Sequence, residues 1–352
     1  MDDSELHRLG AAARSRLLRS GGTSAAHLLD VTLRAISREP EVFGDLDVPG
    51  AREAAAEADG LLAASDRRPL LGVPVAVEEG CATAVPALRA AGAVVLGRTR
   101  AADAARVVTS GCASAVLARN ALGARTPAAV SGVVGFQPHL PRGGPRTGVI
   151  AARSADVALV LDGLGTGALA VPDRPLRIGV SLRGLALHSR TGPVMRHAVE
   201  DVAALLSLRG HEVRDSDGRL AAGARVLLAP HLTASPQELA LLDRVVPASL
   251  RGLCRRVAAA ERDVVGGMFD GLDVLVTPGH TGTSRRGPHP ASAPFAPLWR
   301  VSGYPAVSVP AGRGGNGHAL PVQLTASPAA EAVLLPLAAL IEQDAVPPRA
   351  RG

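Results

Sequence analysis

Short apolar runs alternate with amphipathic segments along the chain, and this rhythm predicts an α/β fold. Gly72–Val77 and Gly92–Gly97 are apolar runs of the length and composition typical of buried strands. Ala51–Ala64, rich in Ala and Glu, precedes the first run, and Ala84–Ala91 separates the two, so both segments are expected to be helices. Strands and helices in alternation are typical of a largely parallel sheet covered by helices.

Capping and breaking residues indicate where further helices begin and end. Ser24 and Ser154 are expected to cap helices, and Pro193 suits the first turn of a helix that Gly210 ends. The remaining expected elements are strands at Arg177–Val180, Val226–Leu228, Val274–Thr277, Ala306–Val309 and Val322–Leu324, helices at Pro236–Gly266 and Ala329–Gln343 (kinked at Pro336), and loops at Thr109–Ala113, Ala124–Pro127, Pro138–Gly148 and Gly279–Pro297.

A single domain is the simplest interpretation of the whole chain. We see no repeat and no linker between two cores, so a single domain over residues 1–352 is expected, with 344–352 as a tail. Hydrophobic residues make up 47% and charged residues 20%, which is typical of a globular protein and excludes a disordered chain. Because aromatic residues are only 2%, the core must be built from Ala, Val and Leu.

The basic residues are the most informative part of the composition. All 38 are arginine, so every mechanism that needs a lysine is excluded. The formal net charge is +6, but the arginines are dispersed, and the densest groups are pairs such as Arg67-Arg68. One Trp, one Tyr and four Phe offer little surface on which bases could stack, so no nucleic-acid partner is expected.

Cysteine usage and hydropathy indicate the compartment. Cys81, Cys112 and Cys254 are an odd set without C-x-x-C spacing, which supports neither a disulfide framework nor a zinc site. Met1–Glu5 is acidic and does not resemble a signal segment. No apolar run of about 18 residues occurs, so no association with a membrane is expected. We therefore expect a cytoplasmic protein without a cofactor.

Six strings follow one another in a fixed order: Leu71–Val77, Ala90–Thr99, Gly132–Pro138, Ala152–Asp162, Asp273–Pro278, and Gly303–Pro310 followed by Leu320–Leu324. Taken together they resemble the amidase signature family, over about Ser4 to Gln343. The resemblance implies a mixed central sheet covered on both faces by helices, hydrolysis of small amides, and kinship to the glutaminase subunit of tRNA amidotransferases. It also implies a catalytic set of a serine, a second serine at a cis peptide and a lysine base.

The lysine of that set belongs directly after the Gly72–Val77 strand, where this chain has Glu78-Glu79. A carboxylate adds negative charge to a site that must stabilise a developing oxyanion, and this raises the barrier to amide hydrolysis. Glu78 is therefore either a replacement base or a strand-end carboxylate that faces solvent.

The two serines of the set are matched poorly. Ser110 is the best match to the cis serine, although most of the flanking glycines that help such a loop are replaced; it is either catalytic or an ordinary polar loop residue. The nucleophile belongs in a Thr-Gly-Gly-Ser turn, and Ala121–Ala129 runs past that point without the turn. Thr126 is the nearest hydroxyl, but it stands before Pro127 and off the expected position. The loops after Glu79 and before Ala152 are also shorter than the family pattern.

Cysteine and histidine offer no clear substitute. Cys112 has no obvious base, so a small buried side chain is the simpler interpretation of it than a nucleophile. The histidines lack the spacing of metal ligands, and surface positions are expected for His188, His197, His211, His280 and His289.

Three hypotheses follow. The first is an amidase-signature scaffold without the family's catalysis: a binding or interaction protein, with a small amide as its ligand, or a decayed gene product. The second is a weak or altered amide hydrolase that uses Ser110 with Glu78 or a histidine. The third, a subunit of a tRNA-dependent amidotransferase, needs the same absent lysine and ranks last. The oligomeric state has no signature in the sequence.

Overall fold

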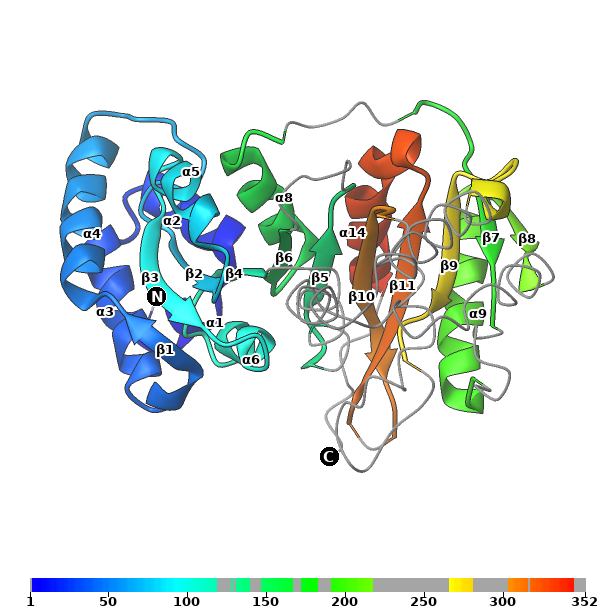
Figure 1. Ribbon diagram of the computed structural model, residues 1–352, viewed down its shortest axis with the longest axis horizontal. Coiled ribbons are helices and arrows are strands. Elements are labelled where there is room, and N and C mark those ends of the chain that lie inside the picture. Colours follow the sequence, from blue (N-terminus) through cyan, green and yellow to red (C-terminus); the bar gives the residue numbers. More distant parts are fainter. Residues whose placement is uncertain are drawn as a thin grey trace, which may run out of the picture.

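The computed structural model describes residues 2–118, 128, 131–139, 147–166, 172–182, 191–217, 266–280, 303–315 and 317–344. The expected strand at Val226–Leu228, the helix at Pro236–Gly266, Thr126 and most of Gly279–Pro297 lie outside these residues. One sheet of 11 strands runs through the molecule in the order β1-β3-β2-β4-β6-β5-β10-β11-β9-β7-β8 (Figure 1).

The strands are short, and most are buried. Their bounds are β1 Phe43–Leu46, β2 Pro74–Glu78, β3 Val94–Thr99, β4 Ala115–Ala118, β5 Val134–Gln137, β6 Gly148–Ala151, β7 Arg177–Val180, β8 Glu212–Asp215, β9 Val274–Pro278, β10 Ala306–Arg313 and β11 Ala319–Ala326. Every strand expected within the described residues is present.

The helices also follow the amphipathic segments. Ser24 caps the third helix by accepting the N–H of His27 at 3.1 Å, as expected. The helices are α1 Asp3–Arg8, α2 Ala11–Arg19, α3 Ala25–Ile36, α4 Val48–Ala63, α5 Val85–Ala90, α6 Ala104–Thr109, α8 Ser154–Gly163, α9 Pro193–Leu208 and α14 Leu334–Asp344, with short 3-10 turns η1 Pro40–Val42, η2 Ala82–Ala84 and η6 Pro328–Val333.

The sheet is mixed, as the family resemblance implies, and the largely parallel sheet expected from the βα rhythm alone is wrong. Parallel pairing joins β2 to β3 and β4, and β7 to β8 and β9. Antiparallel pairing joins the strands between these two groups, including the β10–β11 hairpin. The two strands of a hairpin follow one another in the sequence without an intervening helix. The alternation of strands and helices in the N-terminal half therefore does not predict this antiparallel pairing.

Two helix boundaries differ from expectation. Arg153, not Ser154, is the N-cap of α8, and its N–H donates to Asp156 at 3.0 Å. The last helical segment does not kink at Pro336, which lies in the first turn of α14. Main-chain N–H groups in the first turn have no partner within the helix, so a proline there removes no hydrogen bond. The break falls earlier, because Ala330 has non-helical dihedrals between η6 and α14.

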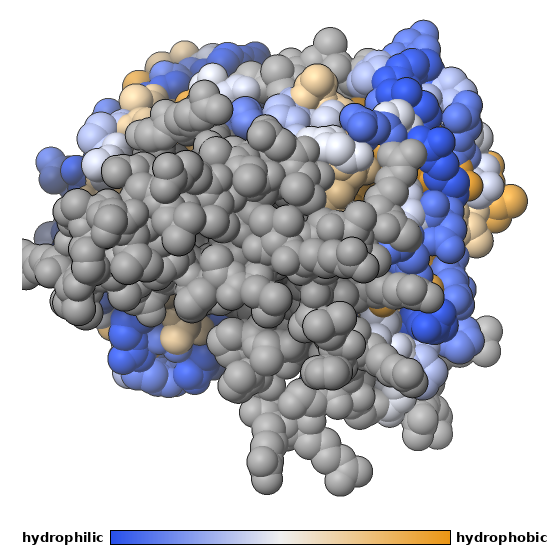
Figure 2. All heavy atoms as spheres, turned by 45° about the vertical axis from the view of Figure 1, so that its right-hand side comes forward, coloured by the Kyte–Doolittle hydropathy of each residue, from blue (hydrophilic) through white to orange (hydrophobic). Residues whose placement is uncertain are grey.

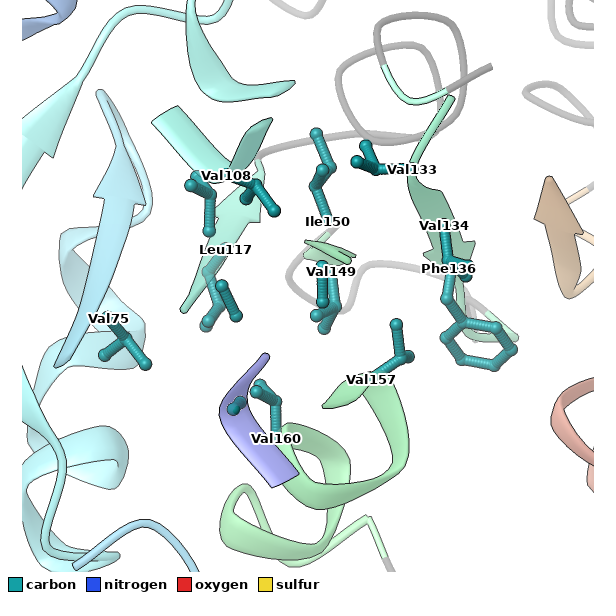
Figure 3. Packing of buried hydrophobic residues seen from close by; sticks show 14 of the residues in the cluster. Val75, Val108, Leu117, Val133, Val134, Phe136, Val149, Ile150, Val157 and Val160 are labelled. Carbon is teal, nitrogen blue, oxygen red and sulfur yellow. The ribbon is translucent and has the colours of Figure 1, made fainter. Parts of the chain in front are cut away.

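Helices cover the sheet on both faces. Because successive side chains of a strand point to opposite faces, the position of a residue in its strand decides which helix it packs against. Figure 3 shows Val157 and Val160 of α8 on one side, near Val75, Leu117, Val149 and Phe136, and Val108 of α6 with Ile150 on the other. These side chains belong to the main hydrophobic core, which is built almost wholly from Ala, Val, Leu and Ile as the composition predicts.

The described surface is largely polar. Figure 2 shows a band of hydrophilic side chains along its right-hand side. The large hydrophobic side chains exposed within the described ranges are Val194 and Leu208, both on α9. Among the described helices, none combines the length and the hydropathy that crossing a bilayer requires.

Candidate functional site

Glu78 ends β2 as a buried residue, only 3% exposed, and pairs in parallel register with Thr99 of β3. The alternative that it is a solvent-facing carboxylate is therefore wrong. Burial follows from the strand's position, because β2 lies between β3 and β4 and all five of its residues are buried. The chain turns directly afterwards, where the N–H of Cys81 donates to the carbonyl of Glu78 at 2.9 Å.

Ser110 follows the last residue of α6 and closes that helix. Its hydroxyl donates to the carbonyl oxygen of Arg106 at 2.7 Å and lies 3.4 Å from Cys112 Sγ. A serine nucleophile needs a base that accepts its proton. Neither of these partners is such a base, since one is a main-chain carbonyl and the other a thiol.

The loop after α6 contacts the strand that carries Glu78. The N–H of Ser114 donates to the carbonyl of Pro74 at 2.9 Å, which places the loop after α6 at the beginning of β2. Glu78 stands at the other end of that strand. The four steps of strand from Pro74 to Glu78 rise roughly 13 Å, so the loop after α6 meets β2 at the end remote from Glu78.

Cys112 is a buried side chain, as expected, with no accessible surface. Burial raises the pKa of its thiol, and the hydrogen bond with Ser110 opposes this shift only in part. A thiol whose pKa is raised carries little thiolate at neutral pH and is a poor nucleophile.

Histidines and acidic residues form no metal site within the described part of the chain. His197 is exposed, as expected, and its Nδ1 lies 2.7 Å from the carbonyl of Pro193. His211 and His280 are only partly exposed, and His188 and His289 lie outside the described residues.

His139 forms a contact that the sequence did not indicate. Its N–H donates to Glu331 at 3.1 Å, and its Nδ1 lies 3.1 Å from the carbonyl oxygen of Gly303. Burial raises the pKa of Glu331, while the His139 N–H and the imidazole lower it. Because 192 positions separate the two residues, no local pattern could have paired them.

A row of polar side chains crosses the middle of the sheet on the face that Glu78 shares. The register places Ser308 opposite Gln323, and Gln323 opposite Thr277. Gln137 lies on the same face of the neighbouring strand β5. We call Gln137, Ser308, Gln323, Thr277 and Thr325 the polar row; each is at most 4% exposed.

The polar row contains unused hydrogen-bonding capacity. Gln137 Oε1 and Ser308 Oγ are buried and have no hydrogen-bond partner among the described residues. Buried polar atoms without partners are costly, and ligands or water usually satisfy them. The row offers amide and hydroxyl groups that can hold a polar ligand, and no strong base or acid of its own.

No family model matches the chain. Two proteins of Mycobacterium tuberculosis, both named "Putative amidase", are similar in sequence. AmiB2 is 29% identical, with 97% of this chain and 97% of AmiB2 covered, and AmiA2 is 26% identical, with 82% of each covered. A glutamyl-tRNA(Gln) amidotransferase subunit of Roseiflexus castenholzii is 36% identical over 118 residues, which are 26% of this chain and 24% of that protein.

Solved structures show the same fold. A structure described as an amidase has a TM-score of 0.78 at 20% identity, covering 96% of this chain and all of the other. A bacterial aryl acylamidase of the amidase signature enzymes has a TM-score of 0.77 at 18% identity, covering 96% of both chains. The resemblance carried by the six strings is thus confirmed, and the fold is the amidase signature fold.

The alignment with AmiB2 also reveals a difference in length. It extends over 450 positions, whereas this chain has only 352 residues. Many positions of the relative therefore have no counterpart in this chain.

Proposed function

We propose that this chain, which has the amidase signature fold, does not hydrolyse carboxamides and acts instead by binding. One observation carries the proposal: no lysine occurs anywhere in the 352 residues. The resemblance places the catalytic lysine of the family where this chain has Glu78.

The position of Glu78 supports the loss of catalysis. A buried carboxylate is an unfavourable neighbour for the oxyanion that forms when a nucleophile adds to an amide carbonyl. The Ser110 hydroxyl donates to the Arg106 carbonyl, whereas general base catalysis needs a base within hydrogen-bond reach of the nucleophile. This arrangement supports the proposal that Ser110 and Glu78 do not replace the catalytic set.

The polar row supports the binding part of the proposal. A primary carboxamide carries both a donor and an acceptor. The unpartnered oxygen of Gln137 would accept from the amide N–H₂, and the Ser308 hydroxyl would donate to its carbonyl. Satisfying two buried orphan groups in one step favours such a ligand over an apolar one.

The experiment is an ammonia-release assay on the purified chain, with primary amides, anilides and glutamine as substrates and an active aryl acylamidase as the positive control. We expect no release above buffer, and the same result for Ser110→Ala and Glu78→Gln. Turnover that disappears in Ser110→Ala would overturn the proposal and establish the alternative, a weak hydrolase that uses Ser110.

Binding is tested separately, by calorimetric titration with benzamide. We expect saturable binding that weakens about tenfold in Gln137→Leu, because the variant removes one buried hydrogen bond of about 1.4 kcal/mol. The matched control is Gln343→Leu, an exposed glutamine near the end of α14. Identical affinity in all three proteins would show that the polar row is not the amide site.

A further inference from the structure

A groove runs along the outer side of α8, on the face of the sheet opposite the polar row. It has a volume of about 640 Å³ and lies between α2 on one side and η6 with the start of α14 on the other. We call it the α8 groove. Its volume falls within the range of roughly 300–1,000 Å³ that is typical of small-molecule sites.

The lining of the α8 groove is mainly apolar. Phe136 contributes a side chain that is 2% exposed, and Figure 3 shows its ring on the α8 side of the sheet, near Val157. Leu159 and Leu335 are half-buried in the walls. Ala158 of α8 is exposed, and its small side chain leaves the groove open at that point.

Two arginines of α2 supply the cationic groups of the groove. Neither Arg16 nor Arg19 forms an ion pair with any described residue, and both line the groove. Arg19 is held in place because its Nη2 donates to the carbonyls of Arg68 at 3.2 Å and Pro69 at 3.4 Å. Its other guanidinium N–H groups remain available.

Two carboxyl groups also line the groove, and neither forms an ion pair with Arg16 or Arg19. Asp162 is exposed and pairs with no described arginine. Glu331 already accepts the main-chain N–H of His139 at 3.1 Å. The guanidinium groups of Arg16 and Arg19 are therefore not engaged by either carboxyl group and can bind a further one.

We propose that the α8 groove binds a small carboxylate with an apolar body. Arg16 and Arg19 donate to the carboxylate oxygens, since a guanidinium presents paired donors to such a group. The apolar body lies against Leu159, Leu335 and Phe136. This site is separate from the polar row, because Phe136 and Gln137 are adjacent on β5 and point to opposite faces.

The test is calorimetric titration of the whole chain with 4-phenylbutyrate and with 4-phenylbutan-1-ol, a neutral molecule of nearly the same shape. We expect the acid to bind at least tenfold more tightly than the alcohol. The Arg16→Gln/Arg19→Gln variant should remove most of this difference and leave the weak binding of the alcohol unchanged. Equal affinities for acid and alcohol in the unaltered chain would overturn the proposal.

A second pair of variants locates the site. Ala158→Phe fills the groove from its exposed floor and should abolish binding of the acid, whereas Ala158→Ser should preserve it. The substituted position is exposed, so both variants should fold, which circular dichroism checks. Acid binding that survives in Ala158→Phe would contradict the assignment. None of these measurements depends on turnover, so they are independent of whether the chain hydrolyses amides.

Discussion

Arg14 and Asp273 are buried charged residues that the fold stabilises in different ways. Arg14 is 1% exposed and has no ion pair among the described residues; its guanidinium donates to Ser114 Oγ and the His7 carbonyl, both at 2.9 Å. Burial lowers its pKa to about 10. Asp273 instead accepts hydrogen bonds from two arginines and from a main-chain N–H.

Arg14→Ala should reduce the free energy of unfolding by about 3 kcal/mol, because it removes packed methylenes and leaves two buried acceptors without donors. Arg14→Met keeps an apolar stem in the same place, so its loss of unfolding free energy should be smaller than that of Arg14→Ala. Urea denaturation measures both. Arg52→Ala is the control, since Arg52 pairs with Asp30 at 3.1 Å on the surface and should contribute under about 1 kcal/mol. A loss in Arg14→Ala no larger than in the control would contradict the interpretation.

Asp273 should make stability depend on pH. The hydrogen bonds from Arg174, and then those from Arg177, hold the pKa of its carboxyl group well below the ordinary value. A lowered folded-state pKa means that the contribution is present above the unfolded pKa of about 3.9 and is lost as pH falls below it.

Asp273→Asn should therefore cost about 2 kcal/mol at pH 7, a figure reduced because both arginines are half-exposed. The difference in stability between Asp273→Asn and the unaltered chain should shrink as the pH falls from about 4 toward the acid limit of folding, because the carboxylate becomes protonated. Thermal denaturation across this range measures it, with Asp45→Asn, at an exposed pair with Arg98, as the control. A difference independent of pH would exclude this role of the carboxylate.

At the scale of elements, pattern predicted β7 and α9 and missed α6 and β4. β7 and α9 were recognisable because an apolar run or an amphipathic repeat fills them. The loop expected from Thr109 includes the end of α6, and β4 follows directly after it.

Gly97 permits the pairing of β1 with β3. It has φ of +144° and pairs with Leu46, and an added Cβ would clash with the main-chain oxygen of Asp45. Gly97→Ala should therefore cost about 3 kcal/mol, because backbone must move and the dihedral is strained.

Gly60→Ala should have the opposite effect on stability from Gly97→Ala. Gly60 lies in α4 with nothing within 4 Å of an added Cβ, so alanine should stabilise the chain by about 0.7 kcal/mol through helix propensity. Denaturant midpoints measure both variants. Changes of the same sign would show that the β1–β3 contact does not constrain Gly97.

At the scale of the whole molecule, one sheet joins the N-terminal and C-terminal groups of strands. The junction is the antiparallel pairing of β4 with β6, from Ala115 opposite Ala151 to Ala118 opposite Gly148. α2 reinforces it, since the N–H of Ala12 donates to Asp156 of α8 at 2.8 Å. That residues 1–352 form a single domain remains a prediction.

A single domain should unfold in one cooperative transition, because the β4–β6 junction couples the two groups of strands. Calorimetry tests this through the ratio of the calorimetric to the van't Hoff enthalpy, which should be close to one, and circular dichroism should report the same midpoint. Two resolved transitions would contradict the single domain.

The sequence by itself determined the family resemblance, the core composition, the loss of lysine and the positions of the long elements, because these are properties of contiguous residues. Only the tertiary structure decided that Glu78 is buried, that the loop after Ser110 meets the start of β2, and that His139 contacts Glu331. The polar row and the α8 groove also depend on it. Each of these features joins strands or helices far apart in the chain, and strand register and helix packing, which no local pattern encodes, set the distances between them.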